Sequence, residues 1–535
     1  MNPRSVRDAA FEVLRANGLT SLFANPGSTE LHLLADLPDD LRFVLALHES
    51  SVVGMATGWA IGRGQPALAI LHTTAGLGNA VGALATARVN RAPLVVLVGQ
   101  QDRRHLASEP FLAGRLAGLA GEYPVWVDQP VRPQDLPGSV ARACHEAVTA
   151  RGPALVIVPM DDWAADADDQ QELTAPVRVV RARGAAAAAV AELAGLVAEA
   201  KAPAIVVGAG ADDAETWAAL VALAERLRCP VWQESFGARA GFPQDHPLFA
   251  GHLPADRARL RKTLAPHDLV LTVGAPVFRQ YPYVAGLLVE PGTRVALVSD
   301  DPAEVHRSPA DLALLAPAAA VCVELARLVP AREGSLPAPF ARPAPPAPPE
   351  AGESLRAGHV LAAFAERLPR NAILIEETPS NRPELHARIP AREPLGFLSA
   401  AMGGLGFALP AAVGLRLARP DRPVAAIVGD GSSLYGIQAL WSAAHYGAGA
   451  LFVILSNGGY AVMDRLVEQQ GSKGPWPSFG VDIAGMSRAL GCPARTIAEH
   501  GELLETLDDV LPALQDRTEP LLLEVTVAPD TTFAP

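Results

Sequence analysis

The chain has 535 residues, of which 50% are hydrophobic and 19% are charged, a composition typical of a globular protein built on large buried sheets. Its formal net charge is −13 and it has no block of basic residues, which argues against nucleic acid and against an anionic membrane surface as partners. No apolar run is long enough to span a membrane, the N-terminus lacks a signal-peptide pattern, and the four scattered cysteines show no metal-binding spacing. We therefore expect a cytoplasmic protein with reduced thiols.

Residues 1–180 are predicted as a first domain, because helical and strand patterns alternate there. Residues 4–22 carry apolar positions at helical spacing, and residues 51–61 form a second helical pattern rich in Gly and Ala. The predicted strands are SLFAN, FVLALHE, PALAILHTT, PLVVLVGQQ and PALVIVP. Such alternation favours a parallel sheet covered by helices on both faces.

Residues 181–330 are predicted as a second α/β domain, which a Pro-rich linker at 331–352 follows. The domain opens with an Ala-rich helix at 185–200, and its strands are expected in APAIVV, CPVWQES, DLVLTVGAP and RVALVSDDP. Gly208-Ala209-Gly210 follows the first of these strands without the third glycine of a dinucleotide-binding G-x-G-x-x-G motif. We interpret it as a tight turn after a strand.

Residues 353–535 are predicted as a third α/β domain, which carries the most informative pattern in the chain. A helix at 354–368, the strand AILIEE and a Gly-rich turn into a helix come first. PVAAIV and ALFVILSN then have the pattern of buried strands, with a helix over LYGIQALWSAAHYG between them. Asp430 in GDGS follows the first strand, and Asn457 ends the second.

Asp430 and Asn457 are expected to converge, because ligands of open α/β sheets bind outside the carboxyl ends of the strands. Their oxygens suit Mg²⁺, which takes few protein ligands beside phosphate oxygens, and the N-terminus of the following helix offers N–H groups to an anion. The alternative is a plain strand–helix turn that uses Gly and Asp for their turn conformations. The full succession of GDGS, helix, strand and Asn-Gly is more specific than that and favours a diphosphate–metal site.

Over essentially its whole length the chain resembles the decarboxylase group of thiamine-diphosphate enzymes, and within that group the benzoylformate decarboxylases. The segments that carry the resemblance are ANPGSTEL, ALHESSVVGMATGWA, LHTTAGLGNAVGALATA, APLVVLVGQQ, VGAPVFR, GGLGFALPAAVG and GDGSSLYGIQALW. The resemblance implies three doubly wound α/β domains: a pyrimidine-binding domain, a middle domain and a diphosphate-binding domain. It also implies thiamine diphosphate and Mg²⁺ as cofactors.

The resemblance implies catalytic roles for three residues of the first domain. Glu49 would hydrogen-bond the aminopyrimidine ring of the cofactor and promote deprotonation of the thiazolium; on the residues alone it would be an acid at a helix N-terminus. Ser28 would contact the substrate carboxylate, and His72 would donate a proton, a role for which histidine is generally suited. Without the resemblance, Ser28 is a turn or cap residue and His72 an interior polar group.

Further contacts implied by the resemblance lie mainly in the third domain. The carbonyl of Gly403 would hold the 4′-amino group of the cofactor, and Leu405 would bend the cofactor, although Leu405 also suits a plain core position. The Mg²⁺ ligands would be Asp430, Asn457 and the carbonyl of Gly459. The remaining cofactor contacts would be Asn25, Pro26, Gly429, Gly431, Ser432 and Tyr460. The substrate pocket would be lined by Ser28, His72, Met463 and Leu466.

One position departs from the family pattern. The second active-site histidine of the family follows VFR in the middle domain, whereas this chain has VFRQYPY, which places Tyr281 at that position. Tyr281 is therefore a candidate catalytic residue, and the exact 2-keto acid stays open.

The activity implied by the resemblance is decarboxylation of a 2-keto acid, with a benzoylformate-like aromatic substrate favoured, to an aldehyde and CO₂, and with carboligation as a side activity. One alternative is a 2-hydroxy-ketone carboligase or lyase. Another is an acetolactate-synthase-like enzyme with flavin in the middle domain, and a third is a non-catalytic binding or scaffold protein. The resemblance also implies a homotetramer as the assembly, a dimer of dimers with active sites between subunits.

Overall fold

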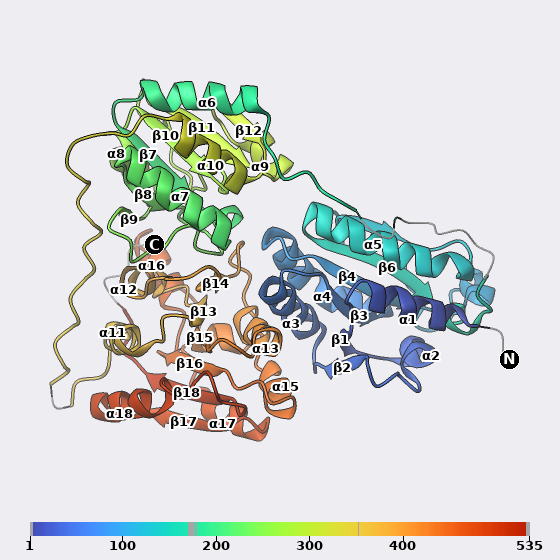
Figure 1. Cartoon of the computed structure of the whole chain (residues 1–535). Coiled ribbons are helices and arrows are strands. Elements are labelled where there is room, and N and C mark those ends of the chain that lie inside the picture. The colour runs from blue at the N-terminus through green and yellow to red at the C-terminus, as the bar shows by residue number, and fades with distance from the viewer. Residues whose placement is uncertain (1–3, 169–175, 177–178, 351, 531–535) are drawn as a thin grey trace.

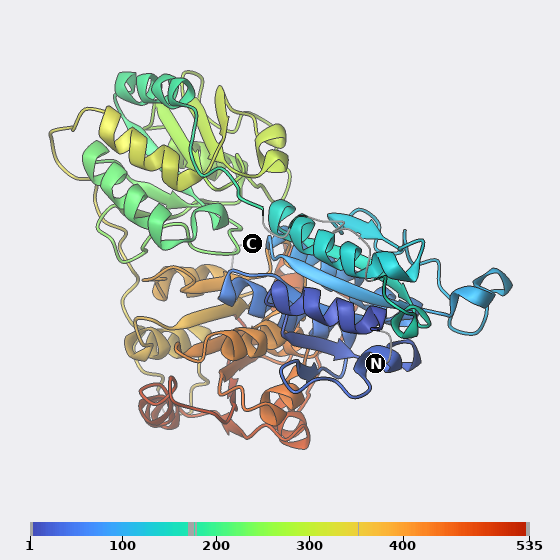
Figure 2. The ribbon, with the colours of Figure 1, turned by 45° about the vertical axis from the view of Figure 1, so that its right-hand side comes forward.

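Three parallel six-stranded sheets form the protein, and they confirm the predicted α/β fold class. The computed structural model describes residues 4–168, 176, 179–350 and 352–530. Figures 1 and 2 show the middle sheet above the third domain, with the first domain beside them. We place the domain boundaries between the sheets, as proposed from the sequence; residue 351 and most residues of 169–178 lie outside the described part of the chain.

The first sheet has the strand order β2-β1-β3-β4-β6-β5. Its strands are β1 (Ser21–Asn25), β2 (Arg42–Leu45), β3 (Ala67–His72), β4 (Leu94–Gln100), β5 (Trp126–Asp128) and β6 (Pro153–Pro159). Its helices are α1 (Val6–Ala16), α2 (Leu31–Leu34), α3 (Glu49–Arg63), α4 (Thr73–Val89) and α5 (Leu136–Ala150), with 3₁₀ turns at Ser28–Glu30, Arg103–Ser108, Pro133–Asp135 and Asp162–Ala164. Successive strand residues point to opposite faces, so Leu22 packs with α1 and α5 while Phe23 packs with α3 and α4.

The middle sheet has the order β12-β11-β10-β7-β8-β9. Its strands are β7 (Pro203–Val207), β8 (Val231–Gln233), β9 (Phe249–His252), β10 (Leu269–Val273), β11 (Arg294–Ser299) and β12 (Leu312–Leu315). Its helices are α6 (Ala187–Glu199), α7 (Ala214–Leu227), α8 (Arg257–Leu264), α9 (Pro302–Arg307) and α10 (Ala318–Leu328), with a 3₁₀ turn at Ala209–Ala211. The Pro-rich segment 331–350 then runs without helix or strand along the left edge of Figure 1.

The third sheet has the order β14-β13-β15-β16-β18-β17. Its strands are β13 (Ile373–Glu377), β14 (Phe397–Ser399), β15 (Val424–Gly429), β16 (Leu451–Ser456), β17 (Ala494–Ile497) and β18 (Leu521–Thr526). Its helices are α11 (Ala357–Arg367), α12 (Arg382–Arg388), α13 (Ala408–Ala418), α14 (Asp430–Ser433), α15 (Ala439–His445), α16 (Ala461–Glu468), α17 (Ile483–Ala489) and α18 (His500–Val510). β15 and β16 are adjacent and in parallel register, which brings their carboxyl ends together.

Helices α3 and α13 join the first domain to the third through glycines. A Cβ atom on Gly58 would lie 2.2 Å from the carbonyl oxygen of Ala411, and one on Gly414 would lie 1.9 Å from that of Met55. Only glycine permits this backbone approach, which explains the Gly-rich pattern seen in the sequence. The buried apolar residues of both domains form one continuous core around this contact.

Two helix predictions are wrong. The helix predicted over residues 4–22 ends at Ala16, because Gly18 takes a left-handed φ of +70° and β1 begins at Ser21. The helix predicted over LYGIQALWSAAHYG is shorter: its first five residues form a turn, and only α15 is helical. The short helix α14 lies before it, in the GDGS segment itself. Gly436 in that turn packs on the loop before α13, where a Cβ atom would lie 3.0 Å from the carbonyl oxygen of Gly406.

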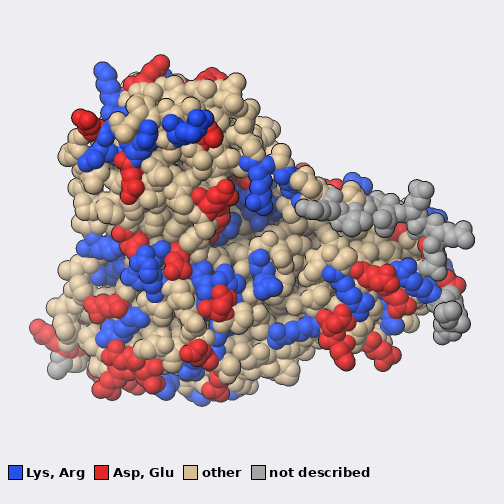
Figure 3. Space-filling model, viewed as in Figure 1, with Lys and Arg blue, Asp and Glu red and all other residues tan. Residues whose placement is uncertain are grey.

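Surface charge is mixed, as the composition suggested. On the face shown in Figure 3, acidic and basic side chains are interspersed over all three domains. Within the described part of the chain, no helix combines the length and the apolar character that crossing a membrane requires.

Candidate functional site

Asp430 joins the carboxyl ends of β15 and β16. Its carboxylate accepts the backbone N–H of Gly431 at 2.8 Å, that of Asn457 at 3.0 Å and that of Gly458 at 2.7 Å. Burial raises the pKa of this carboxyl group, although the three hydrogen bonds act in the opposite direction. A cation at this place would offset the cost of burying the negative charge.

Asn457 and Gly459 complete an oxygen-rich turn after β16. The side-chain oxygen of Asn457 accepts the backbone N–H of Gly459 at 3.1 Å, so the amide is held within the turn. Among the described residues, no three His, Cys, Asp or Glu side chains gather as a metal site. The donors here are one carboxylate, one amide and nearby backbone carbonyls, a set that suits Mg²⁺ shared with a phosphate.

A cavity of about 530 Å³ surrounds this turn. The predicted residues that line it are Gly403, Leu405, Gly429, Asp430, Gly431, Ser432, Asn457, Gly459, Tyr460 and Met463. The lining residues that the sequence did not single out are Thr378, Pro379, Ser380, Asn381, Tyr435, Leu455, Val462 and Trp476. Among the described residues, Leu466 is not in this lining although it lies on α16 with Met463, and Asn25, Pro26, Ser28, His72 and Tyr281 are not in it either.

Glu377, at the end of β13, fixes the loop that carries Gly403 and Leu405. Its buried carboxylate accepts the backbone N–H groups of Gly406, Phe407 and Ala408 at 2.7, 2.9 and 2.7 Å. Phe407 is the N-cap and Ala408 the first residue of α13, so their N–H groups have no partners inside the helix, and Gly406 immediately precedes them. Burial raises the pKa of Glu377 to about 7, and the three hydrogen bonds limit that rise.

Glu49 is the first residue of α3 and is 9% exposed. Asn25 and Asn79 donate their side-chain N–H groups to its two carboxylate oxygens, each at 3.1 Å. Asn25 ends β1, Glu49 begins the helix after β2 and Asn79 lies in the helix after β3, so the three meet at the carboxyl edge of the first sheet. One carboxylate held by two amides in a shielded place can hydrogen-bond a ring nitrogen in a fixed direction.

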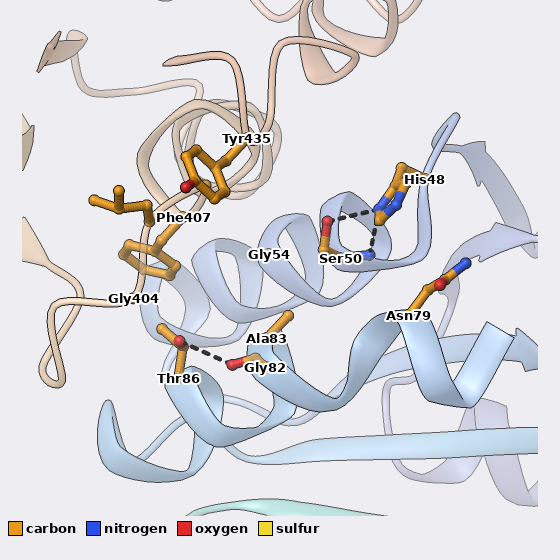
Figure 4. Close-up of a pocket in the computed structure, with 12 residues that line it drawn as sticks. His48, Ser50, Gly54, Asn79, Gly82, Ala83, Thr86, Gly404, Phe407 and Tyr435 are labelled. Carbon is orange, nitrogen blue, oxygen red and sulfur yellow. Dashed lines mark hydrogen bonds between the residues drawn. The ribbon is translucent and has the colours of Figure 1, made fainter. Parts of the chain in front are cut away.

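A second cavity, of about 370 Å³, lies between the first and third domains (Figure 4). His48, Ser50 and Asn79 line it from the first domain. His48 and Ser50 flank Glu49 in the chain, and Asn79 donates a hydrogen bond to it. Leu405 and Tyr435 line both this cavity and the one around Asp430. Leu405 and Tyr435 therefore connect the two cavities, although Glu49 itself lines neither of them.

His72 ends β3 and contacts the turn that contains Ser28. Its Nδ1 lies 2.9 Å from Thr29 Oγ1 and 3.1 Å from Glu30 Oε2. A Cβ atom on Gly27 would lie 2.5 Å from the His72 ring, so only glycine lets the turn pack on it. Because the carboxylate of Glu30 accepts a hydrogen bond from Nδ1, we assign the ring proton to Nδ1. Nε2 is then available to contact another group in the site. Ser28 begins the adjacent 3₁₀ turn with an exposed side chain.

Tyr281 lies outside both cavities and is 55% exposed. Two residues earlier, Arg279 donates to the carbonyl oxygen of Ala401 at 3.2 Å, so the segment is attached to the loop that leads to Gly403. Tyr281 itself donates its backbone N–H to the carbonyl oxygen of Ala255, in the middle domain, at 3.2 Å.

Several residues of the site were not predicted from the sequence. Glu377 ends an ordinary buried strand, and its N–H partners lie about 30 positions further along the chain, so no local pattern indicates it. Asn79 stands mid-helix, where an amide has no special signal. Glu30 could have been noticed, since an acid three residues after Gly27 resembles a capping box, and it does accept the N–H of Gly27 at 2.7 Å.

Family models match the chain in three parts: the N-terminal TPP binding domain of the thiamine pyrophosphate enzymes at residues 4–117, their central domain at 190–325 and their C-terminal TPP binding domain at 383–525. A benzoylformate decarboxylase of Pseudomonas aeruginosa is 40% identical over 98% of both chains. The solved structure of a Rhodococcus jostii thiamine diphosphate-dependent 4-hydroxybenzoylformate decarboxylase is 36% identical, covers 99% of this chain and 100% of its own, and superposes with a TM-score of 0.93. An acetolactate synthase large subunit of Parasynechococcus marenigrum is 28% identical over 98% of this chain and 88% of its own.

Proposed function

The chain belongs to the thiamine pyrophosphate enzyme family, and we propose that it is a thiamine-diphosphate- and Mg²⁺-dependent 2-keto-acid decarboxylase that acts on an aromatic substrate such as benzoylformate. This proposal rests on the residues found at the carboxyl edges of the first and third sheets. Glu49 is buried at one edge, Asp430 at the other, and Leu405 lines the cavities on both sides.

The residues present fit the cofactor. Asp430, Asn457 and the carbonyl of Gly459 would hold Mg²⁺ and through it the diphosphate, with Gly429, Gly431 and Ser432 beside them. Leu405 would support the bend of the cofactor, and the carbonyl of Gly403 would accept its 4′-amino group. Asn25, Pro26 and Tyr460 complete the proposed contacts. When bound, thiamine diphosphate supplies a cationic thiazolium ring that takes up the electron pair left by departing CO₂.

The side chains of the protein would orient groups and move protons. Glu49, held by two amide donors, would hydrogen-bond the aminopyrimidine ring of the cofactor in a fixed direction. Ser28 would bind the substrate carboxylate. His72, whose Nδ1–H donates to Glu30, would relay a proton through Nε2, which takes it up from water before giving it to the substrate. Met463 and Leu466 on α16 would exclude water from the acyl group of the substrate. Tyr281, in the middle domain, would take the catalytic position that the family gives to its second histidine.

A flavin in the middle domain is disfavoured by its glycine turns. In a doubly wound sheet the dinucleotide lies where the strand order reverses, here between β7 and β10. A Cβ atom on Gly208 would lie 2.9 Å from the carbonyl oxygen of Gly274, and one on Gly210 would lie 2.8 Å from its Cα. The two turns thus pack on each other at the place where a dinucleotide would bind. Carboligation remains part of the proposal, because it uses the same site.

We propose a homodimer as the smallest active unit, doubled into a tetramer. Apolar side chains beside the two cavities are exposed in the single chain, with Met402 at 68%, Tyr435 at 55% and Leu405 at 38%. A second copy would cover them and shield the cofactor from water. A cytoplasmic location also remains a proposal, which the four buried cysteines without disulfides support.

The test is a panel of aromatic and aliphatic 2-keto acids incubated with thiamine diphosphate and Mg²⁺, with aldehyde and 2-hydroxy ketone quantified separately. Aldehyde from benzoylformate as the main product would support the proposal. Hydroxy ketone in excess of aldehyde would favour the carboligase, and acetolactate from pyruvate by a yellow protein would favour the flavin-containing alternative.

A further inference from the structure

The cavity around Asp430 has one wall that no sequence motif indicates. Trp476 forms this wall together with Val462 and Met463 of α16. The loop after β13 lines the cavity with polar groups instead, those of Thr378, Ser380 and Asn381. The lining therefore includes both hydrogen-bonding groups and an apolar surface that contains an aromatic ring.

Two contacts hold the indole of Trp476 in place. Its Nε1–H donates to Asp464 Oδ1 at 2.8 Å, and this bond ties the loop after α16 back to the helix. The ring also folds over Gly474, where a Cβ atom would lie 2.1 Å from Trp476 Cζ2, so any larger residue would displace it. An indole N–H donates only one hydrogen bond, and here Asp464 accepts it, so the ring is oriented without using a group of the cavity.

We propose that Trp476 is a specificity-determining residue that selects 2-oxo acids with a planar aromatic acyl group, and that Asp464 is its positioning residue. This inference rests on the proposed decarboxylase function and deepens it. A ring already fixed in orientation loses little conformational entropy when a second ring packs against it, and aromatic pairs gain stability beyond their buried area. An aliphatic acyl group gains less from the same surface.

The proposed contact between Trp476 and the acyl group is tested by the selectivity of the enzyme between an aromatic and an aliphatic 2-oxo acid. Steady-state kcat and KM are measured with benzoylformate and with 2-oxobutanoate for the parent enzyme, Trp476→Ala and Trp476→Phe, all saturated with thiamine diphosphate and Mg²⁺. We expect Trp476→Ala to lower kcat/KM for benzoylformate about tenfold and that for 2-oxobutanoate less than about twofold. Trp476→Phe, which keeps a ring, should retain most of the selectivity. An unchanged ratio of the two kcat/KM values in Trp476→Ala would overturn the inference.

The role of Asp464 is tested by Asp464→Ala, with Glu468→Ala as the matched control. Glu468 is an acid of the same helix that pairs with Arg465 on the exposed side. Asp464→Ala should raise the KM for benzoylformate about threefold with a smaller change in kcat, since a loosened indole weakens binding more than chemistry. Glu468→Ala should leave both constants unchanged. Equal effects of the two variants would contradict the positioning role.

The parent enzyme separates this inference from the proposed function. If the parent releases no CO₂ from either 2-oxo acid, the proposed function on aromatic 2-oxo acids fails, and the inference that rests on it fails with it. If the parent decarboxylates both and Trp476→Ala changes neither their ratio nor their KM values, the function stands and the inference fails.

Discussion

The carboxylate of Glu377 accepts the backbone N–H of Gly406 at 2.7 Å, and this contact connects the end of β13 to the loop that lines both cavities. With Phe407 and Ala408 it satisfies the open end of α13. Since α13 packs backbone to backbone on α3, the same helix also sets the distance between the third domain and the helix that begins at Glu49.

Glu377→Ala should weaken cofactor binding and lower stability. Each buried N–H left without an acceptor costs about 1–3 kcal/mol, so the loss of three acceptor contacts should lower the free energy of unfolding by several kcal/mol. The concentration of thiamine diphosphate that gives half-maximal activity should rise, because Gly403 and Leu405 lose their support. Denaturant unfolding and cofactor titration measure both effects. Glu366→Ala, at an exposed position on α11, is the control. An equal loss in both variants would contradict the proposed role of Glu377 in holding the loop.

Glu49→Gln should lower turnover at least about a hundredfold, the usual scale for loss of a positioned acid–base group. Cofactor affinity should change little, because the amide fills the same space between Asn25 and Asn79. Calorimetry of thiamine diphosphate binding and single-turnover rates test the two parts separately. Near-parental rates in the variant would remove Glu49 from the proposed mechanism.

Asp430→Ala should impair retention of the cofactor and not only turnover. The carboxylate ties three backbone N–H groups at the ends of β15 and β16, and it is the single charged donor of the proposed Mg²⁺ site. Chelation by EDTA should abolish parental activity, which added Mg²⁺ should restore. The variant should recover little at high Mg²⁺ and thiamine diphosphate, whereas unchanged cofactor affinity would refute the role of metal ligand.

Glu234 gives the protein a stability that depends on pH. Burial raises its pKa from 4.5 to about 7, and Arg279 at 4.0 Å compensates only in part. Between these values the folded state binds more protons than the unfolded state, so the free energy of unfolding falls as pH rises from about 4.5 to about 7, by at most about 3 kcal/mol. Glu234→Gln removes this titration. Its Tm should match or exceed that of the parent at pH 8, with a smaller difference at pH 4.5; a lower Tm at pH 8 would contradict this account.

Tyr281→His should shift product formation toward free aldehyde. After CO₂ leaves, the reacting carbon must gain a proton, and histidine in general gives one near neutral pH, whereas a phenol does so only near pH ~10. We therefore expect the parent to form more 2-hydroxy ketone per aldehyde released than the variant. The product ratio from benzoylformate with added acetaldehyde measures this, with Tyr283→His, an exposed neighbour, as the control. An unchanged ratio would discard the idea.

The sequence predicted what depends on local pattern. Continuous apolar runs marked β15 and β16, and polar residues at their ends marked Asp430 and Asn457, because strand order alone brings these ends together. The strands β5, β9, β12, β14, β17 and β18 were missed. All of them except β18 have only three or four residues, too few to show a periodicity. The break between α14 and α15 was also missed, because it depends on Gly436 packing against Gly406.

Contacts between distant segments could not be predicted. Three such contacts are made by side chains that stand in no recognisable sequence motif. They are the contacts of Glu377 with the start of α13, of Asn79 with Glu49 and of Trp476 with Asp464. The placement of Leu466 outside the cavity lining likewise depends on how α16 is rotated, which its apolar pattern does not specify.

The most direct test of the account is the stoichiometry of CO₂ release from benzoylformate by the protein stripped of cofactor and then reconstituted. We predict no release without thiamine diphosphate and Mg²⁺, and one CO₂ per aldehyde or aldehyde equivalent in hydroxy ketone once both are added. Failure of the fully reconstituted protein to release CO₂ from benzoylformate or from any other 2-keto acid would contradict the proposed function.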